Sequence, residues 1–298
     1  MRGEMNVRAY ICDFLEQFNY PQEARECLLS TYDQIMENGE TRAMWEGFLA
    51  AYEADYLCDL RAVIAGADRV AGLIGINEFT VDLLIFICLS KHLKALYVAR
   101  GIPMAYYEKS MADLRYKLDE CQLVYGVVGS FVADWFRGFF HLTRFGIGRL
   151  QFEIIPFNSN YEKNGIALTP TSKVLNVHIP RSGEPLTEEA CLASYLAAKE
   201  FFKDEIGMDP CPFVCHSWLL DPQFDSFMPR HTNTYRFYKS FDIYEWEIKK
   251  DRRDLWRLFD TMEQNPDRLP ADSSMRRAFI EHLKRGGRLG AGRGILFV

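Results

Sequence analysis

Residues 174–202 read VLNVHIPRSGEPLTEEACLASYLAAKEFF and decide how the second half of the chain folds. The apolar run 174–179 predicts a β-strand, and the polar residues 181–185 predict a tight turn. A helix is expected at 187–202, starting at Thr187, with Glu188 and Glu189 in its first turn, where acidic residues are favourable. This succession of a strand, a turn and a helix predicts a sheet of the α/β type.

The turn at 181–185 has features of a phosphate-binding site. A helix that begins directly after a strand presents free backbone N–H groups and the positive end of its dipole to the turn. Arg181 adds a charge for an anionic ligand, and Gly183 lets a ligand approach the backbone closely. The alternative interpretation is that Ser, Gly and Pro serve here only to turn the chain and cap the helix.

The rest of the second half continues the alternation of strands and helices. Three further apolar segments predict strands, and a fourth segment alternates aromatic and polar residues in the manner of a strand: 149–155, 213–219, 294–298 and 235–244. Helices are expected at about 221–228, 251–262 and 272–285. The glycine-rich segment 286–294 is interpreted as a turn before the last strand.

The first half shows helical periodicity only. Apolar residues recur every three or four positions, starting with Val7, Ile11 and Phe14. We expect Asn38-Gly39 to end the second helix and Thr41 to cap the third. Later helices are expected at about 54–66, 78–99 and 103–120. The pattern predicts a helical domain at 1–125 and an α/β domain at 126–298, with 126–148 as the connecting segment.

Composition narrows the class of protein. The chain has 298 residues, 48% of them hydrophobic, which is enough for well-packed cores, and a net charge of −6. The acidic balance argues against a nucleic-acid-binding protein, which needs a basic face. The eight cysteines follow no repeat, so we expect reduced thiols. The most apolar segment, 79–98, contains Asp82, Lys91 and Lys94, so we expect it to be a buried core helix without membrane insertion. We also expect a cytoplasmic protein with no signal peptide.

Four segments resemble a bacterial family of paired domains, in which an N-acyltransferase N-terminal helical domain precedes a GNAT-like C-terminal domain. The segments are RFGIGRLQFE at 144–153, VLNVHIPRSG at 174–183 with Leu186-Thr187, SWLLDP at 217–222 and RGGRLGAGRG at 285–294. The resemblance implies an N-terminal helical bundle followed by a GNAT-like mixed α/β domain with a central splayed sheet. It also implies an acyltransferase that takes acetyl-CoA or another acyl-CoA as co-substrate and a small-molecule amine as acceptor.

In the GNAT superfamily the acyl-CoA binds between the central strand and the following helix, which places it here at 174–179 and 187–202. The candidate cofactor-binding residues are Ile179, Pro180, Arg181, Ser182, Gly183, Thr187 and Ser217. The superfamily's turn usually reads Gln/Arg-x-x-Gly-x-Gly/Ala, and Arg181-Ser182-Gly183-Glu184-Pro185 departs from it. This departure favours the alternative of a non-catalytic, GNAT-shaped scaffold that binds a small molecule or a protein.

Direct acyl transfer needs a base for the attacking amine and an acid for the leaving thiolate. The candidate bases are His178, His216 and Glu153, each on a predicted strand, and the candidate acid is Tyr235 or, alternatively, Tyr238. His178 and Asn176 share one face of their strand, because side chains alternate with a period of two. For each residue the alternative is a hydrogen-bonded structural side chain.

Two other chemistries use residues near His216. Cys211, Cys215, His216 and His231 have atoms that bind zinc, but Cys215 and His216 are adjacent on a strand and point to opposite faces. We therefore expect no metal. The same geometry argues against a nucleophile and base made of Cys215, His216 and Ser217, and a hydrolase stays as a third alternative. The acceptor, the acyl chain and the oligomeric state are not predicted.

Overall fold

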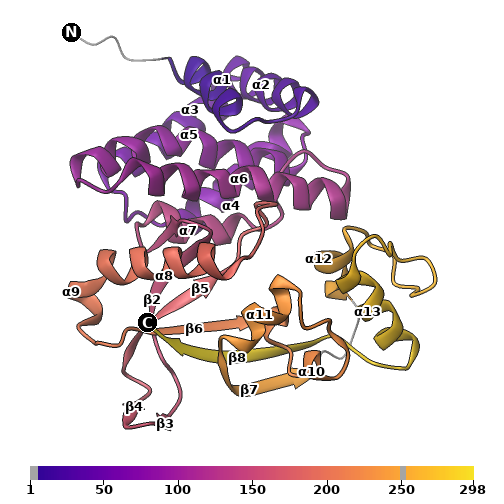
Figure 1. The fold of residues 1–298 in the computed structure, drawn as a ribbon. Helices are drawn as coiled ribbons and strands as arrows, with labels where there is room; N and C mark the ends of the chain where they lie inside the picture. Colours follow the sequence, from indigo (N-terminus) through magenta and orange to yellow (C-terminus); the bar gives the residue numbers. More distant parts are fainter. Residues whose placement is uncertain (1–5, 249–252) are drawn as a thin grey trace. The chain divides into compact units, whose positions relative to one another are not determined.

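The computed structural model describes residues 6–248 and 253–298. The chain divides into two compact units, one ending at Phe145 and the other beginning at Gly146 (Figure 1). The boundary falls within 126–148, the segment expected to connect two domains. We call the two parts the helical unit and the sheet unit. Among the described residues, no helix combines the length and the apolar character needed to span a membrane.

The helical unit consists of helices joined by short turns. They are α1 (Val7–Gln17), α2 (Gln22–Glu37), α3 (Gly39–Ala54), α4 (Leu60–Ile74), α5 (Glu78–Ala99), α6 (Met104–Tyr125) and α7 (Ala133–Phe140). Helix α5 has the bounds predicted from the sequence, and all its residues from Thr80 to Ser90 are buried. A helix that is apolar all round is a core helix, so α5 is the element around which the others pack.

Two helix ends differ from those expected. Asn38 ends α2 as expected, but it also caps α3 in place of Thr41, since its side chain accepts hydrogen bonds from the backbone N–H groups of Glu40 and Thr41. Thr41 is not a cap: its buried hydroxyl donates to the carbonyl of Ile35 at 2.8 Å. The helix expected at 54–66 begins only at Leu60, where Asp59 caps α4. Both caps are Asn or Asp, the residue types with the strongest preference for this position.

The sheet unit contains one mixed sheet with the strand order β1-β2-β5-β6-β8-β7 (Figure 1). Its strands are β1 (Arg144–Ile147), β2 (Leu150–Pro156), β5 (Lys173–His178), β6 (Pro212–Ser217), β7 (Asp242–Ile248) and β8 (Gly290–Phe297). The ladder between β5 and β6 is parallel, and those of β2 with β5, β6 with β8 and β7 with β8 are antiparallel. Strands β3 (Tyr161–Lys163) and β4 (Ile166–Leu168) form a separate hairpin. The predicted fold class, helices followed by a mixed α/β sheet, is confirmed.

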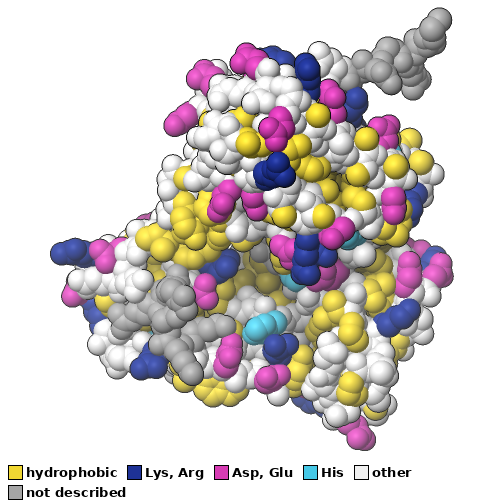
Figure 2. Space-filling view, turned by 180° about the vertical axis from the view of Figure 1, so that it is seen from behind, with side chains coloured by type: hydrophobic (Ala, Val, Ile, Leu, Met, Phe, Trp, Pro, Cys, Tyr) yellow, Lys and Arg dark blue, Asp and Glu magenta, His cyan; other side chains and the backbone are white. Residues whose placement is uncertain are grey.

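Each face of the sheet carries its own apolar layer. Helix α8 (Glu188–Phe201) packs on one face, where the ring of Tyr195 lies 6.1 Å from Phe152 and 5.0 Å from Phe213. On the other face Val174, Val214 and Ile295 form a cluster with two residues near the β3–β4 hairpin, Phe157 and Leu168. Figure 2 shows a surface on which hydrophobic side chains are interspersed with acidic and basic ones.

The other helices of the sheet unit are shorter than α8. They are α9 (Lys203–Ile206), α10 (Phe224–Phe227), α11 (Asn233–Lys239), α12 (Trp256–Phe259) and α13 (Ser274–Lys284), with 3-10 turns η1 (Trp218–Leu220) and η2 (Arg253–Leu255). The strand predicted at 235–244 is wrong, because its first part is α11 and only its second part enters β7. Gly290, Gly292 and Gly294 lie in β8 and not in a turn before it. The helix predicted at 251–262 lies partly outside the described residues.

Candidate functional site

The sheet opens between its two parallel strands. Strand β5 pairs with β2 along its whole length, from Lys173 opposite Pro156 to His178 opposite Gln151. With β6 it forms two pairs, Leu175 opposite Phe213 and Asn176 opposite Val214. Strand β6 stays paired with β8 as far as Ser217. The carboxyl-terminal ends of β5 and β6 therefore diverge beyond Asn176, as predicted for a splayed sheet.

Three polar side chains meet at this opening. The Oε1 atom of Glu153 lies 2.7 Å from Nε2 of His178 and 3.1 Å from Nδ2 of Asn176. They share one face because Glu153 is opposite Asn176 in the ladder and His178 follows two residues later. The side chains of His178 and Glu153 are 21% and 16% exposed, so both are shielded but reachable from solvent.

The contact between Glu153 and His178 limits the roles of the two groups. If Glu153 is ionised it only accepts hydrogen bonds, so Nε2 of His178 would donate to it and Nδ1 would carry the lone pair of a neutral ring. A carboxylate that orients an imidazole also stabilises the imidazolium formed when the ring takes a proton. The arrangement is thus suited to general base catalysis. Sequence analysis proposed Glu153 and His178 separately, and the structure brings them together.

His216 lies on the other side of the opening. It is exposed near the end of β6, opposite Arg293 of β8, and shares a face with Val214 and hence with Asn176. It lines a polar cavity of about 50 Å³ together with Glu245, Glu247, Trp246, Ala291 and Arg293. Nε of Arg293 lies 3.4 Å from Oε2 of Glu245. The opening is therefore flanked by a histidine on each strand.

The residues next to His216 have structural roles. The Ser217 hydroxyl accepts a hydrogen bond from the backbone N–H of Leu219 at 3.1 Å and so caps η1. Cys215 is buried, and burial raises the pKa of its thiol to about 12, which keeps it protonated and poorly nucleophilic. In the described ranges no group of three or more His, Cys, Asp or Glu side chains is arranged to hold a metal ion. This geometry does not support the hydrolase alternative.

Arg149 fixes the turn between β5 and α8. Its guanidinium donates to the carbonyls of Pro180 and Glu184 at 3.1 and 3.0 Å, and its backbone N–H donates to the Ser194 hydroxyl at 2.8 Å. Gly148, directly before it, has φ +63°, and a Cβ there would meet the Ser194 side chain. Arg149 thereby holds the end of β5, including Ile179, at a set distance from the start of α8.

Fewer backbone amides are open to a phosphate in this turn and at the start of α8 than the sequence suggested. The Ser182 hydroxyl accepts from the N–H of Glu184, and the Thr187 hydroxyl accepts from that of Ala190. The Glu189 carboxylate accepts from its own backbone N–H and from Thr187, which holds its pKa below the usual range. Arg181 pairs with Asp260 at 2.5 Å. Gly183 has φ +77° and open space around it, so it remains the accessible point of the turn.

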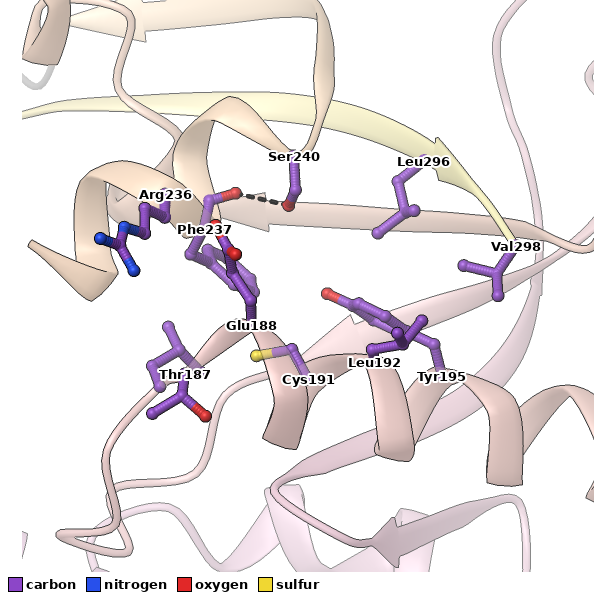
Figure 3. Close-up of a pocket in the computed structure, with 11 residues that line it drawn as sticks. Thr187, Glu188, Cys191, Leu192, Tyr195, Arg236, Phe237, Ser240, Leu296 and Val298 are labelled. Carbon is purple, nitrogen blue, oxygen red and sulfur yellow. Dashed lines mark hydrogen bonds between the residues drawn. The ribbon is translucent and has the colours of Figure 1, made fainter. Parts of the chain in front are cut away.

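A mostly apolar pocket of about 160 Å³ lies between α8, α11 and the end of β8 (Figure 3). Helix α8 contributes Cys191, Leu192 and Tyr195, and Arg236 of α11 lies at its border. The Tyr195 side chain is 4% exposed, its hydroxyl has no hydrogen-bond partner among the described residues, and it points into the pocket (Figure 3). The other lining residues are Leu186, Thr187, Glu188, Phe237, Ser240, Leu296 and Val298.

Each of the two units matches a known protein domain family. Residues 10–142 match the N-acyltransferase N-terminal domain, and residues 144–296 match the GNAT-like C-terminal domain. The chain belongs to the family that joins these two acyltransferase domains. No curated protein sequence matches it.

Solved acyltransferase structures share the fold of this family member. An acyltransferase mutant in complex with octanoyl-CoA is 19% identical, with a TM-score of 0.72, over 97% of this chain and 87% of that chain. An acyltransferase in complex with decanoyl-CoA and teicoplanin is 20% identical, with a TM-score of 0.71, over 96% of this chain and 87% of that chain. The resemblance stated from the sequence is thereby confirmed for the fold.

Some polar residues of this acyltransferase-family chain lie differently from expectation. Tyr235 is on α11, where its hydroxyl donates to Asp225 at 2.8 Å, and Tyr238 donates to the same carboxylate at 2.9 Å. Tyr195 was not predicted as a site residue; it lies four residues after Cys191 on the buried side of α8. In the sequence that spacing is typical of core residues and carries no sign of a binding role.

Proposed function

We propose that this chain is an acyl-CoA-dependent N-acyltransferase that moves an acyl group directly from a CoA thioester to a small-molecule amine. The observation that carries the proposal is the contact between Glu153 and His178 at the point where β5 and β6 diverge. The solved relatives that hold octanoyl-CoA or decanoyl-CoA have the same fold and support this donor class.

The pocket of α8 and α11 fits the arm of an acyl-CoA. It offers apolar walls for the methylene groups, and it lies beside β6, because Tyr195 packs on Phe213. The unpaired hydroxyl of Tyr195 indicates that a ligand with a polar group belongs there. Since several amides of the preceding turn are occupied, the charge that meets the phosphates comes from Arg236 at the border of the pocket.

The reaction follows from the positions of the two histidines. The amine nitrogen attacks the thioester carbonyl carbon, an N–C bond forms, and the C–S bond breaks to release a thiolate. His178 takes the proton that the amine loses, and the Glu153 carboxylate stabilises the resulting imidazolium. His216, on the opposite strand but the same face, returns a proton to the thiolate when its ring is protonated. The polar cavity around His216, with Glu245 and Glu247, forms the acceptor side.

The experiment that tests this function measures binding and transfer separately. CoA, acetyl-CoA and decanoyl-CoA are titrated into the purified chain by calorimetry, and released thiol is measured with a panel of primary amines. We expect CoA esters to raise the melting temperature and thiol release to depend on an amine. Absence of heat and of a melting shift with every CoA ester would contradict the proposal.

A non-catalytic ligand-binding scaffold is the second candidate. The observation in its favour is that the chain's own Ser182, Thr187 and Glu189 side chains occupy amides of the turn and of the start of α8 that a phosphate would otherwise bind. It predicts that a ligand other than a CoA ester raises the melting temperature, and that no amine increases thiol release.

A further inference from the structure

Among the described residues, the Tyr195 hydroxyl is a buried polar group without a hydrogen-bond partner, and Tyr195 lines the pocket between α8 and α11. We infer that this hydroxyl determines specificity for the donor by donating a hydrogen bond to an amide carbonyl of the pantetheine arm of CoA. The inference rests on the proposed function and assigns a residue to one part of the donor.

An unpaired buried hydroxyl calls for a physical explanation. Almost all buried polar groups in folded proteins have hydrogen-bond partners, because the loss of hydration is otherwise not compensated. Tyr195 is 4% exposed and packs between the rings of Phe152 and Phe213, so its side chain is firmly held. Burial raises the pKa of its phenol, which keeps it protonated and able to donate.

The other hydroxyls that line the pocket already have partners. Thr187 accepts from the backbone N–H of Ala190, and Ser240 donates to the carbonyl of Phe237 at 2.7 Å (Figure 3). Tyr195 therefore differs from both, and its hydroxyl points into the space between α8, α11 and β8 (Figure 3). A hydrogen-bond acceptor atom of a bound ligand would therefore pair with the Tyr195 hydroxyl.

The chemistry of the pocket distinguishes the arm of CoA from its acyl chain. A saturated acyl chain has no acceptor atom within its length, so it would leave the Tyr195 hydroxyl unpaired. The pantetheine arm alternates methylene groups with two amides. Its methylene groups match Leu192 and Leu296, and an amide carbonyl supplies the missing acceptor. The observations thus favour the arm at this position, with the acyl chain placed elsewhere.

The test compares Tyr195→Phe with a matched control, Tyr20→Phe. Tyr20 is also buried with an unpaired hydroxyl, but it lies in the helical unit next to Phe14. Each variant loses one hydroxyl, so both ligand-free proteins should melt at or above the wild-type temperature. We expect Tyr195→Phe to weaken CoA binding about tenfold in calorimetry, as loss of one hydrogen bond predicts. Tyr20→Phe should bind CoA like the wild type.

Each other outcome has a distinct meaning. If wild type and Tyr195→Phe bind CoA equally well, the inference is wrong and the proposed function stands. If the wild type binds no CoA ester, both are wrong. A ligand-free Tyr195→Phe protein that melts below the wild type would show a structural partner for the hydroxyl and overturn the inference. So would a loss of affinity that grows from acetyl-CoA to decanoyl-CoA, since the hydroxyl would then lie beside the acyl chain.

Discussion

A polar cluster in the core of the helical unit and the polar groups of the sheet unit differ in their access to a ligand. In the helical unit the Tyr10 hydroxyl bonds Ser90 and Tyr107 at 2.8 and 3.0 Å, wholly inside the core. In the sheet unit Glu153 and His178 bond each other at the edge of an opening between strands, and Tyr195 faces a pocket. The three hydroxyl groups of the helical unit hydrogen-bond one another inside the core, whereas the polar groups of the sheet unit remain accessible to a ligand.

This difference has a cause in backbone geometry. A helix satisfies its own interior N–H and C=O groups, so α5 can be buried from Thr80 to Ser90 without leaving a gap. Two parallel strands that diverge leave side chains at their ends with no strand between them. We therefore expect substitutions of polar residues in the helical unit to change stability, and those at the opening of the sheet unit to change function.

The largest expected effect is on catalysis. Replacement of His178 by Ala, or of Glu153 by Gln, removes the base or its orienting carboxylate and should lower the rate of acyl transfer by about 10²–10⁴-fold. Affinity for CoA, measured by calorimetry, should change little. Tyr235→Phe is the control, because that hydroxyl bonds Asp225 and should leave the rate unchanged.

The same assay can contradict the roles proposed for the two histidines, with His178 as the base and His216 as the acid. If His178→Ala retains the wild-type rate while His216→Ala loses it, the base is on β6 and the contact between Glu153 and His178 is structural. The comparison of the two units would then hold for the pocket of Tyr195 but not for the Glu153–His178 pair.

A smaller effect, on stability, is expected at Gly292 in the sheet unit. A Cβ at this position would overlap the carbonyl oxygen of Leu220, a backbone atom that cannot move aside cheaply. Gly292→Ala should lower the free energy of unfolding by about 3 kcal/mol, the upper part of the usual range for overpacking. The contact is part of what keeps η1, at the end of β6, against β8. Urea denaturation measures the change.

The matched control for Gly292 is in the helical unit. Gly47 lies within α3, and a Cβ there meets nothing within 4 Å. Gly47→Ala should raise the free energy of unfolding by about 0.5–1 kcal/mol, because Ala is the better helix former. Equal effects of the two substitutions would show that close packing at Gly292 does not constrain the sheet.

An effect smaller than that at Gly292 is a dependence of stability on pH that originates in the helical unit. Asp82 is 6% exposed and its Oδ1 has no hydrogen-bond partner among the described residues. Burial, with the charges of Asp68 and Glu78, raises its pKa to about 8. The folded state thus favours the protonated acid, so stability is greatest below the ordinary pKa of about 4 and falls as pH rises through about 8.

Asp82→Asn should abolish this slope and make the protein more stable than wild type at pH 9, by about 2 kcal/mol. Urea denaturation at pH 5, 7 and 9 provides the measurement. Parallel stability curves for wild type and Asp82→Asn would show that Asp82 is ionised in the folded protein. Acyl transfer at pH 7 should be unaffected, which would mark the polar groups of the helical unit as structural.

Local patterns predicted much of the fold. Helix α5 has its expected bounds because its apolar run is long and uninterrupted by Gly or Pro. Helix α8 was expected to start at Thr187, and it begins one residue later because the Thr187 hydroxyl caps it. The segment 235–244 misled because its aromatic residues also fit helical spacing: Tyr235 and Tyr238 lie three residues apart within α11, with ring centroids at 5.9 Å. Thr232, which caps α11, was the overlooked signal.

The candidate site was less predictable, since it depends on contacts between distant segments. Glu153 and His178 were each proposed as a base, but their contact requires the antiparallel register of β2 and β5. The β3–β4 hairpin lies between these strands in the sequence, and no signal for it was identified. For Tyr195, the helical position indicated burial, but only the structure shows a hydroxyl without a partner.

The place of β8 has a consequence for how the chain acquires its structure during synthesis. Strand β8 lies between β6 and β7, although it follows both in the sequence (Figure 1). Before residue 297 has left the ribosome, β6 and β7 have no strand to join them, and the sheet unit exposes unpaired strand edges. The helical unit has no such dependence on later residues. A nascent chain should therefore need protection from aggregation mainly during its second half.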